Sequence, residues 1–377
     1  MLRIGIVAGE ASGDMLGSLL VQALKKKRSD IEFVGIAGPK MMSEGVQSLF
    51  PMERLSVRGY LEVIKHAYGL IRIRRQLIQH FLHHRVDMFI GVDAPDFNFY
   101  LEKKLKKQGI TTIHYVSPSI WAWRKNRLNK IKRAVSHVLT LFPFESVLYQ
   151  QAGIPVSFVG HPLADLLPMV PDTAAARARL RLKPTDLLVA MLPGSRQSEV
   201  AQHATLFIQT AKRLLADFPH AVFLVPFVTR ASKQIFELAL FHEPEPLPIQ
   251  ILFGHAHDAM QASDLVIAAS GTATLEAALL KKPMVITYRM PSLSWQILKR
   301  MHLQAYVGLP NILAGKFIVP ELLQNDATPE KLAAAAMTLL SDKSAIMAMT
   351  AEFSQMHESL RQNNAEKVAN LILSNFS

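Results

Sequence analysis

The sequence contains no cysteine, which excludes disulfides, thiolate nucleophiles and cysteine-ligated metals together. Such a chain is easiest to reconcile with a reducing compartment, so we expect it in the cytoplasm. Long apolar runs are also missing, because no stretch reaches the length of a membrane-spanning helix. Met1–Val7 is apolar but lacks the length and the flanks of a signal peptide.

Several ligand-binding motifs are absent as well. The glycine-rich segment Gly9–Asp14 has neither the G-x-G-x-x-G spacing of a dinucleotide site nor the Gly-Lys-Ser/Thr of a P-loop. The carboxylates of Asp93 and Asp96 do not form a D-x-D motif, and the 14 histidines show no H-E-x-x-H spacing. We therefore predict that the protein binds no metal and no cofactor.

The chain has 377 residues, half of them hydrophobic, which is enough for two ordinary domains. Its net charge of +12 is unevenly distributed. Up to Val135 there are 23 Lys and Arg against 11 Asp and Glu, whereas the remainder carries 19 of each. This asymmetry suggests an anionic partner: nucleic acid, a membrane surface or a phosphorylated substrate. A solvated basic face without a partner is the alternative.

Short apolar runs alternate with helical segments, which predicts an α/β fold with two Rossmann-like parallel sheets in tandem. The expected strands are 4–7, 33–37, 88–92, 111–116, 138–140, 187–192, 221–225, 248–252, 265–268 and 284–287. We predict an N-terminal domain over residues 1–162 and a C-terminal domain over 163–344. A C-terminal helix is expected at about 345–377, and whether it packs back on the first domain is left open.

Loops at the carboxyl ends of parallel strands are where such folds bind ligands. In Ser270–Glu276, Gly271 permits a sharp turn and Thr272 or Thr274 can cap a helix whose start binds an anion. Glu276, one turn later, can accept hydrogen bonds from sugar hydroxyls, so the stretch favours a nucleotide-sugar diphosphate. An ordinary turn with a surface glutamate is the alternative.

Pro193–Arg196 is a second candidate anion loop, since it offers backbone N–H groups and a guanidinium that can bind phosphate. A structural salt bridge from Arg196 to Glu199 is the alternative. In the first domain, Asp93–Asn98 closes a strand, and its carboxylates are well placed for general base catalysis. Asp96 or Asn98 can instead cap the following helix, a role that suits Asp96 and leaves Asp93 free.

Val57–Arg85 mixes apolar residues at helical spacing with basic ones, including Arg72, Arg74 and Arg75. This pattern is typical of a helix in a membrane interface, but a core helix with a basic outer face explains it nearly as well. The two indoles of Trp121–Arg124 can line an apolar groove or anchor the core.

Six segments together resemble the lipid-A-disaccharide synthase family, which are inverting glycosyltransferases of the GT-B type: 7–14, 93–98, 114–124, 192–196, 269–276 and 309–315. They cover nearly the whole chain in order. The segments around Asp93 and Trp121 are specific to this family, whereas the one at Ser270 fits many GT-B enzymes. The resemblance implies two Rossmann-like domains whose parallel sheets face a cleft.

The resemblance also implies transfer of 2,3-diacylglucosamine from its UDP derivative to 2,3-diacylglucosamine 1-phosphate, without a metal. Asp93 is the expected base, with Asp96 beside it. The implied donor-side residues are Gly194, Ser195, Arg196, Gly271, Thr272, Glu276 and, by family likeness, Asn311. The implied acceptor-side residues are Glu10, Gly13, Trp121 and Arg124.

The expected partners are the UDP-sugar, the phosphorylated glycolipid and the cytoplasmic surface of the inner membrane, contacted peripherally. No nucleic acid is expected, and a homodimer is left open. One alternative is a UDP-N-acetylglucosamine epimerase on the same fold, for which the basic apolar stretch would have no purpose. The other is a basic nucleic-acid-binding protein, which predicts steeply salt-dependent affinity for oligonucleotides.

Overall fold

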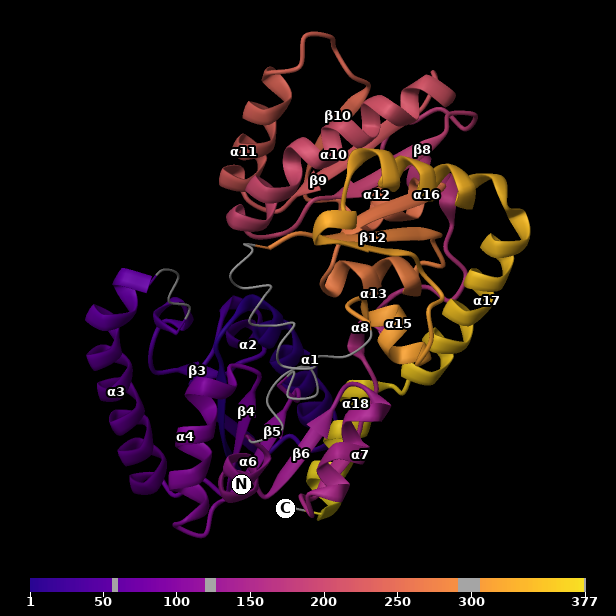
Figure 1. Ribbon diagram of the computed structural model, residues 1–377. Coiled ribbons are helices and arrows are strands. Elements are labelled where there is room, and N and C mark those ends of the chain that lie inside the picture. The colour runs from indigo at the N-terminus through magenta and orange to yellow at the C-terminus, as the bar shows by residue number, and fades with distance from the viewer. Residues whose placement is uncertain (56–59, 119–126, 291–305, 376–377) are drawn as a thin grey trace. The chain divides into compact units, whose positions relative to one another are not determined.

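A computed structural model describes residues 1–55, 60–118, 127–290 and 306–375, with the backbone alone for residues 60–68 (Figure 1). The chain forms two compact units. Unit 1 consists of Met1–Asp165 and Leu360–Ser377, and unit 2 consists of Leu166–Ser359.

Unit 1 contains a seven-stranded sheet of order β3-β2-β1-β4-β5-β6-β7, in which every neighbouring pair is parallel. Its strands are β1 (Leu2–Ala8), β2 (Ile31–Ile36), β3 (Gln47–Ser48), β4 (Met88–Val92), β5 (Thr111–Tyr115), β6 (His137–Thr140) and β7 (Val156–Phe158). Its helices are α1 (Ala11–Lys27), α2 (Pro39–Ser43), η1 (Met52–Arg54), α3 (Tyr60–His83), α4 (Pro95–Lys106), α6 (Leu128–Ala134), α7 (Pro143–Gln151), α8 (Pro162–Leu166) and α18 (Asn364–Asn375). The central strands β1 and β4 are almost entirely buried, in agreement with sequences that are apolar apart from Arg3.

Unit 2 contains a six-stranded parallel sheet of order β10-β9-β8-β11-β12-β13. Its strands are β8 (Leu188–Leu192), β9 (Val222–Phe227), β10 (Ile249–Phe253), β11 (Leu265–Ala269), β12 (Met284–Tyr288) and β13 (Glu321–Leu323). Its helices are α9 (Thr173–Arg179), α10 (Gln197–Asp217), α11 (Arg230–Phe241), α12 (Ala256–Ala262), α13 (Thr272–Leu279), α15 (Leu309–Ala314), η3 (Gln324–Asp326), α16 (Pro329–Ser341) and α17 (Lys343–Leu360).

The predicted pair of parallel-sheet α/β units is confirmed. The prediction omitted β3, β7 and β13, which are edge strands of two or three residues. They are at most half-buried, so they carry no apolar run that would mark them in the sequence.

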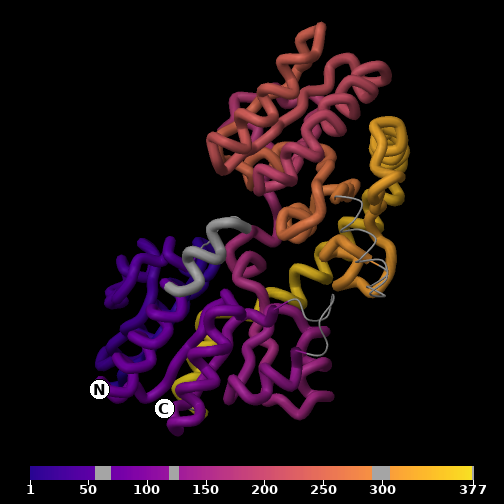
Figure 2. The backbone as a smooth tube through the Cα atoms, turned by 60° about the vertical axis from the view of Figure 1, so that its left-hand side comes forward, coloured from indigo at the N-terminus to yellow at the C-terminus, as the bar shows by residue number. Residues whose placement is uncertain are grey.

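The C-terminal segment forms two helices instead of one, because the chain turns at Asn363, whose φ is 51°. The second helix, α18, lies against α1 of unit 1 and is the yellow segment next to the C-terminus (Figure 2). Val368, Ala369 and Ile372 place it in the apolar core of that unit. At its start, Asn364 donates to the Gly160 carbonyl at 2.9 Å.

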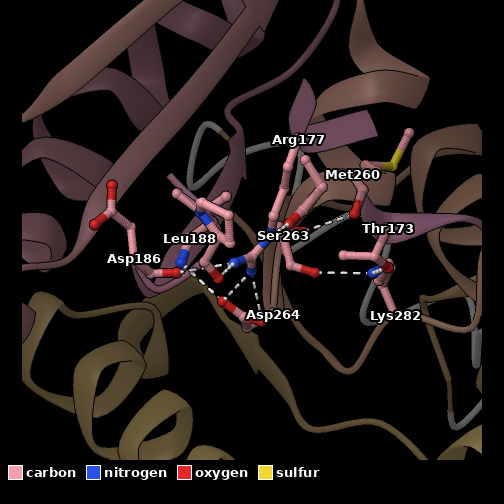
Figure 3. A network of polar contacts seen from close by, with 10 residues as sticks. Thr173, Arg177, Asp186, Leu188, Met260, Ser263, Asp264 and Lys282 are labelled. Carbon is pink, nitrogen blue, oxygen red and sulfur yellow. Dashed lines mark hydrogen bonds and ion pairs between the residues drawn. The ribbon is translucent and has the colours of Figure 1, made fainter. Parts of the chain in front are cut away.

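A polar network joins α9 to the sheet of unit 2 (Figure 3). Arg177 Nη2 binds both carboxylate oxygens of Asp264 at 2.9 Å, and Asp264 also accepts from the backbone N–H of Leu188 at 2.9 Å. Lys282 Nζ donates to Thr173 Oγ1 at 2.9 Å. Burial lowers the pKa of Lys282 to about 8.

Candidate functional site

The two predicted anion loops of unit 2 follow neighbouring strands. β8 leads into Pro193–Arg196, and β11 leads into Ser270–Gly271. The two strands are paired in parallel, with Leu192 opposite Ala268. Both loops therefore open at the same edge of the sheet, where parallel α/β folds bind ligands.

The Pro193–Arg196 loop is organised by Glu199. The carboxylate accepts hydrogen bonds from the backbone N–H groups of Ser195 (3.1 Å) and Arg196 (3.3 Å), and from Arg196 Nη1 (3.3 Å). Gly194 has a φ of 128°, and a Cβ there would lie 2.5 Å from Glu199 Cβ. The alternative prediction, an ion pair between Arg196 and Glu199, is thus present. The N–H groups of Ser195 and Arg196, which we expected to be available to a ligand, are bonded to Glu199. The Arg196 side chain is nevertheless 80% exposed, so it can meet an anion.

Helix α13 begins without a side-chain cap. The prediction that Thr272 or Thr274 caps it was wrong, because Gly271 occupies the N-cap position with a φ of 152°. Thr274 Oγ1 instead donates to the Gly271 carbonyl at 2.8 Å, and Thr272 is exposed in the first turn. Among the residues that the structure describes, no side chain therefore caps the first N–H groups of α13, which favours an anion at this position.

Glu276, one turn into α13, is paired with His257 in the first turn of α12. Glu276 Oε2 lies 2.9 Å from His257 Nε2, and the Glu276 side chain is 19% exposed. This hydrogen bond raises the pKa of His257, against the lowering caused by burial. His257 belongs to none of the predicted site residues, although it follows the carboxyl end of β10, where polar residues are informative.

Asn311 is fully buried, and its amide group is saturated by its own unit. Oδ1 accepts from the backbone N–H groups of Ile318 (2.8 Å) and Val319 (2.9 Å). Nδ2 donates to the Val319 carbonyl and to Glu321 Oε1, both at 2.8 Å. Asn311 thus fixes the segment that follows α15, and a direct bond to a ligand would cost one of these four contacts.

In unit 1 the corresponding loops follow β1 and β4, which are also paired in parallel. They lie in contact, since a Cβ on Gly9 would lie 2.7 Å from the Cβ of Ala94. Asp93 is half-buried and has a left-handed backbone with a φ of 52°. Its backbone N–H donates to the Tyr115 carbonyl at 2.8 Å, and within the described ranges no hydrogen bond reaches its carboxylate.

Asp96 does not cap α4, contrary to the prediction. The N-cap position belongs to Ala94, whose φ is 44°, and Pro95 follows at the start of the helix. The Asp96 side chain is 84% exposed and lies 3.1 Å from Arg127 Nη2. Asn98 turns inward and is fully buried, so neither of the two suggested caps serves the helix end.

Arg74 of α3 differs from its basic neighbours. Its Nη2 donates to the carbonyl of Asp96, and its guanidinium lies 4.9 Å from the ring centre of Phe97 and 5.4 Å from that of Tyr100. Burial lowers its pKa. Arg72 and Arg75 are exposed. Arg74 therefore joins α3 to α4, whereas the other two form the basic outer face.

Two of the four acceptor-side residues are described. Glu10 is exposed at the N-cap of α1 and makes no side-chain capping bond. Gly13 is buried, and a Cβ there would lie 3.4 Å from the Val92 carbonyl, so α1 packs closely on β4. Trp121 and Arg124 lie outside the described residues, as do residues 57–59 of the basic stretch.

Within the described ranges, no three His, Asp or Glu side chains are grouped as metal ligands would be. No single helix in the same ranges is both long and apolar enough to cross a membrane. The helical segments Pro329–Ser341 and Lys343–Asn375 reach that length and apolarity only when they are taken together, and the chain bends by 91° between them.

Comparison with known proteins gives a match over nearly the full length. The model of the family described as lipid-A-disaccharide synthetase matches residues 4–373. The lipid-A-disaccharide synthase of Methylobacillus flagellatus is 65% identical over 375 residues, which is 99% of this chain and 99% of that protein. The enzyme of the same name from Azoarcus sp. is 53% identical over 372 residues, which is 98% of this chain and 95% of that protein.

Solved structures share the fold at low sequence identity. The UDP-GlcNAc 2-epimerase from Neisseria meningitidis bound to UDP-GlcNAc has a TM-score of 0.67 at 11% identity, covering 100% of both chains. CalG4, the calicheamicin glycosyltransferase, has a TM-score of 0.61 at 12% identity, also covering 100% of both chains. At these identities the likeness shows the fold alone.

Proposed function

The chain belongs to the lipid-A-disaccharide synthase family, and on that basis we propose that it transfers 2,3-diacylglucosamine from its UDP derivative to 2,3-diacylglucosamine 1-phosphate. The products are UDP and the disaccharide 1-phosphate precursor of lipid A. The family match over nearly the whole chain is the observation that carries this proposal. A UDP-N-acetylglucosamine epimerase remains only a distant fold neighbour.

The donor is proposed to bind unit 2. The exposed guanidinium of Arg196 and the uncapped start of α13 at Gly271–Thr272 would hold the diphosphate. Glu276 would accept hydrogen bonds from ribose hydroxyls, with His257 fixing one carboxylate oxygen. Gly194 and Ser195 would shape the loop, and Asn311 would act by holding the segment after α15 in place. The related epimerase was solved with a nucleotide sugar bound, which agrees with this use of the fold.

Asp93 is proposed as the general base. A sugar hydroxyl becomes a competent nucleophile when a carboxylate accepts its proton as it attacks. The acceptor oxygen would form the new bond to the anomeric carbon, and the bond to the UDP oxygen would break with its electron pair on UDP. Attack from the face opposite the leaving group inverts the anomeric centre. Asp96, exposed and paired with Arg127, is the second candidate for the base.

We propose that transfer needs no metal. The charge that develops on the leaving diphosphate would be stabilised by the Arg196 guanidinium and by the N–H groups at the start of α13. Donors that are fixed before the reaction stabilise developing charge without reorganisation.

The acceptor is proposed to bind unit 1, whose sequence carries the excess of positive charge. Glu10, Gly13, Trp121 and Arg124 are the proposed acceptor-side residues. The basic outer face of α3 would contact an anionic membrane surface peripherally, on the cytoplasmic side. The proposed reaction involves no nucleic acid.

The direct test is an assay with both lipid substrates in which UDP release and disaccharide 1-phosphate are measured together. We expect UDP release to require both substrates and to match the disaccharide formed. Conversion of UDP-N-acetylglucosamine to its 2-epimer, with no disaccharide in the complete mixture, would support the epimerase instead.

A further inference from the structure

The backbone of the Asp93 loop is held in an unusual conformation. Asp93 and Ala94 are consecutive non-glycine residues in the left-handed region, with φ values of 52° and 44°. Residues other than glycine rarely adopt this backbone conformation, and it persists only where the surroundings enforce it. One restraint is the hydrogen bond from the Asp93 N–H to the Tyr115 carbonyl at 2.8 Å.

A second restraint comes from a side chain. Asn98 is fully buried, and its Nδ2 donates to the Asp93 carbonyl at 2.8 Å and to the Val7 carbonyl at 3.3 Å. One amide group therefore ties the left-handed turn to the end of β1. Its Oδ1 is buried and has no hydrogen-bond partner in the described part of the chain, so the amide serves the turn through its donors alone.

Asn98 is itself kept in position by a buried pair that joins the same face of α4 to β5. Glu102, one turn further along, has Oε1 2.8 Å from His114 Nδ1 of β5, and both side chains have no exposed surface. Gly91 makes room for them, because a Cβ there would lie 2.3 Å from Glu102 Oε1 and 2.9 Å from Asn98 Cβ. Burial raises the pKa of Glu102, although His114 opposes this. Such a pair adds little stability, but it can fix how a helix sits on a sheet.

We propose that Asn98 is a positioning residue for Asp93, and that the Glu102–His114 pair keeps Asn98 in place. The inference rests on the proposed role of Asp93 as the base. Without the Nδ2 bonds, the turn can relax toward ordinary backbone angles, which moves the Asp93 carboxylate relative to the acceptor hydroxyl. A displacement of about 1 Å at a reacting group can reduce turnover roughly a hundredfold.

The test is a double-mutant cycle with Asp93→Asn, Asn98→Ser and the double variant, measuring kcat, donor KM and UDP affinity. Asn98→Ser should lower kcat about ten- to a hundredfold and leave UDP affinity unchanged, because the UDP site lies in unit 2. In the Asp93→Asn background the same substitution should have almost no further effect on kcat, because the positioned group is already gone.

Asn364→Ser is the matched control for stability. Asn364 is also buried in unit 1 and also donates its amide to main-chain carbonyls, those of Val159 and Gly160. Its Oδ1 accepts from the Tyr115 hydroxyl, at the far end of that residue from the backbone carbonyl that binds the Asp93 N–H. It should lower the unfolding temperature much as Asn98→Ser does, with kcat per folded molecule unchanged. A comparable loss of kcat in Asn364→Ser would show that Asn98→Ser acts through stability, and the inference would fail.

Two further outcomes separate the inference from the base assignment. Equal fold-losses from Asn98→Ser in both backgrounds, or full turnover in the single variant, would reject the positioning role while Asp93 remained the base. Full turnover of Asp93→Asn would reject the base assignment, and the positioning role would be rejected with it.

Discussion

Arg196 follows β8, and Glu276 lies one turn into the helix that follows the neighbouring strand β11, so both are proposed to contact the donor. Arg196→Ala and Glu276→Ala should each weaken UDP binding. Losing a charge-assisted hydrogen bond costs about 1.5–3 kcal/mol, roughly ten- to a hundredfold in affinity. Titration of UDP measures this directly. The loop should keep its shape in Arg196→Ala, because Glu199 still binds the backbone N–H groups of Ser195 and of residue 196.

Arg213 provides the matched control for that titration. It is an exposed arginine of α10 that pairs with Glu330 and belongs to neither anion loop. Arg213→Ala should leave UDP affinity unchanged. If Arg196→Ala and Glu276→Ala both titrate like the parent protein, the donor site is misplaced.

Lys282 should leave a signature in the pH dependence of stability. Burial lowers its pKa from 10.5 to about 8, so the folded state holds this proton less tightly than the unfolded chain. Below about pH 8 folding carries the cost of burying the ammonium group, and this cost disappears as the pH rises from about 8 to about 10.5. The unfolding temperature of the parent should therefore rise relative to that of Lys282→Met over this range. Parallel curves for the two proteins would contradict the lowered pKa.

Helix α3 shows why a basic apolar pattern has two interpretations. In its described side chains, Ile73, Leu77 and Phe81 recur every four residues and are buried in the core of unit 1. Arg72, Arg75 and Ile71 are exposed on the other side. The C-terminal half of α3 thus packs as an ordinary core helix, and its exposed basic face is the part proposed to contact a membrane.

Replacing Arg72 and Arg75 with Ser should reduce sedimentation with anionic vesicles, since each basic residue near such a surface contributes about 1 kcal/mol. Arg74→Ser is the matched control: its guanidinium is engaged by α4, so it should lower the unfolding temperature and change vesicle binding little. Equal binding of the parent protein to neutral and anionic vesicles would contradict membrane attachment through charge.

An element can be predicted when its own sequence carries the signal, and it is missed when the signal lies in contacts between distant segments. Strands such as β4 and β11 are buried apolar runs, and the loops after them were found because parallel sheets place ligands at those ends. Edge strands carry no such run. The pairing of His257 with Glu276 depends on how α12 meets α13, and local sequence does not encode that contact.

Contacts between distant segments also explain why two residues have other roles in the structure than the sequence predicts. The sequence position of Asn98 suggests a helix cap, but the side chain is buried against β1 and its amide donates to the Asp93 turn. Family likeness places Asn311 on the donor side, yet its four hydrogen bonds are all internal. A polar residue in a motif identifies the site, and the packing around it decides whether it touches the ligand or supports the loop.

For the molecule as a whole, unit 1 is proposed to supply the base and unit 2 to bind the donor. No step of this mechanism requires a metal ion. Turnover should therefore be unaffected by a chelator present throughout the assay. Loss of turnover in the chelator that is restored by a divalent cation would show that the charge on the diphosphate is stabilised differently.

The central claim is that one reaction draws its base from unit 1 and its donor site from unit 2. Turnover and UDP affinity measured on the same preparation of Asp93→Asn test it most directly. Removing a general base typically lowers turnover by about 10²–10⁴-fold, and we predict a loss in that range with UDP affinity equal to that of the parent. Near-full turnover in Asp93→Asn, or a turnover loss that is accompanied by an equal loss of UDP affinity, would contradict this division.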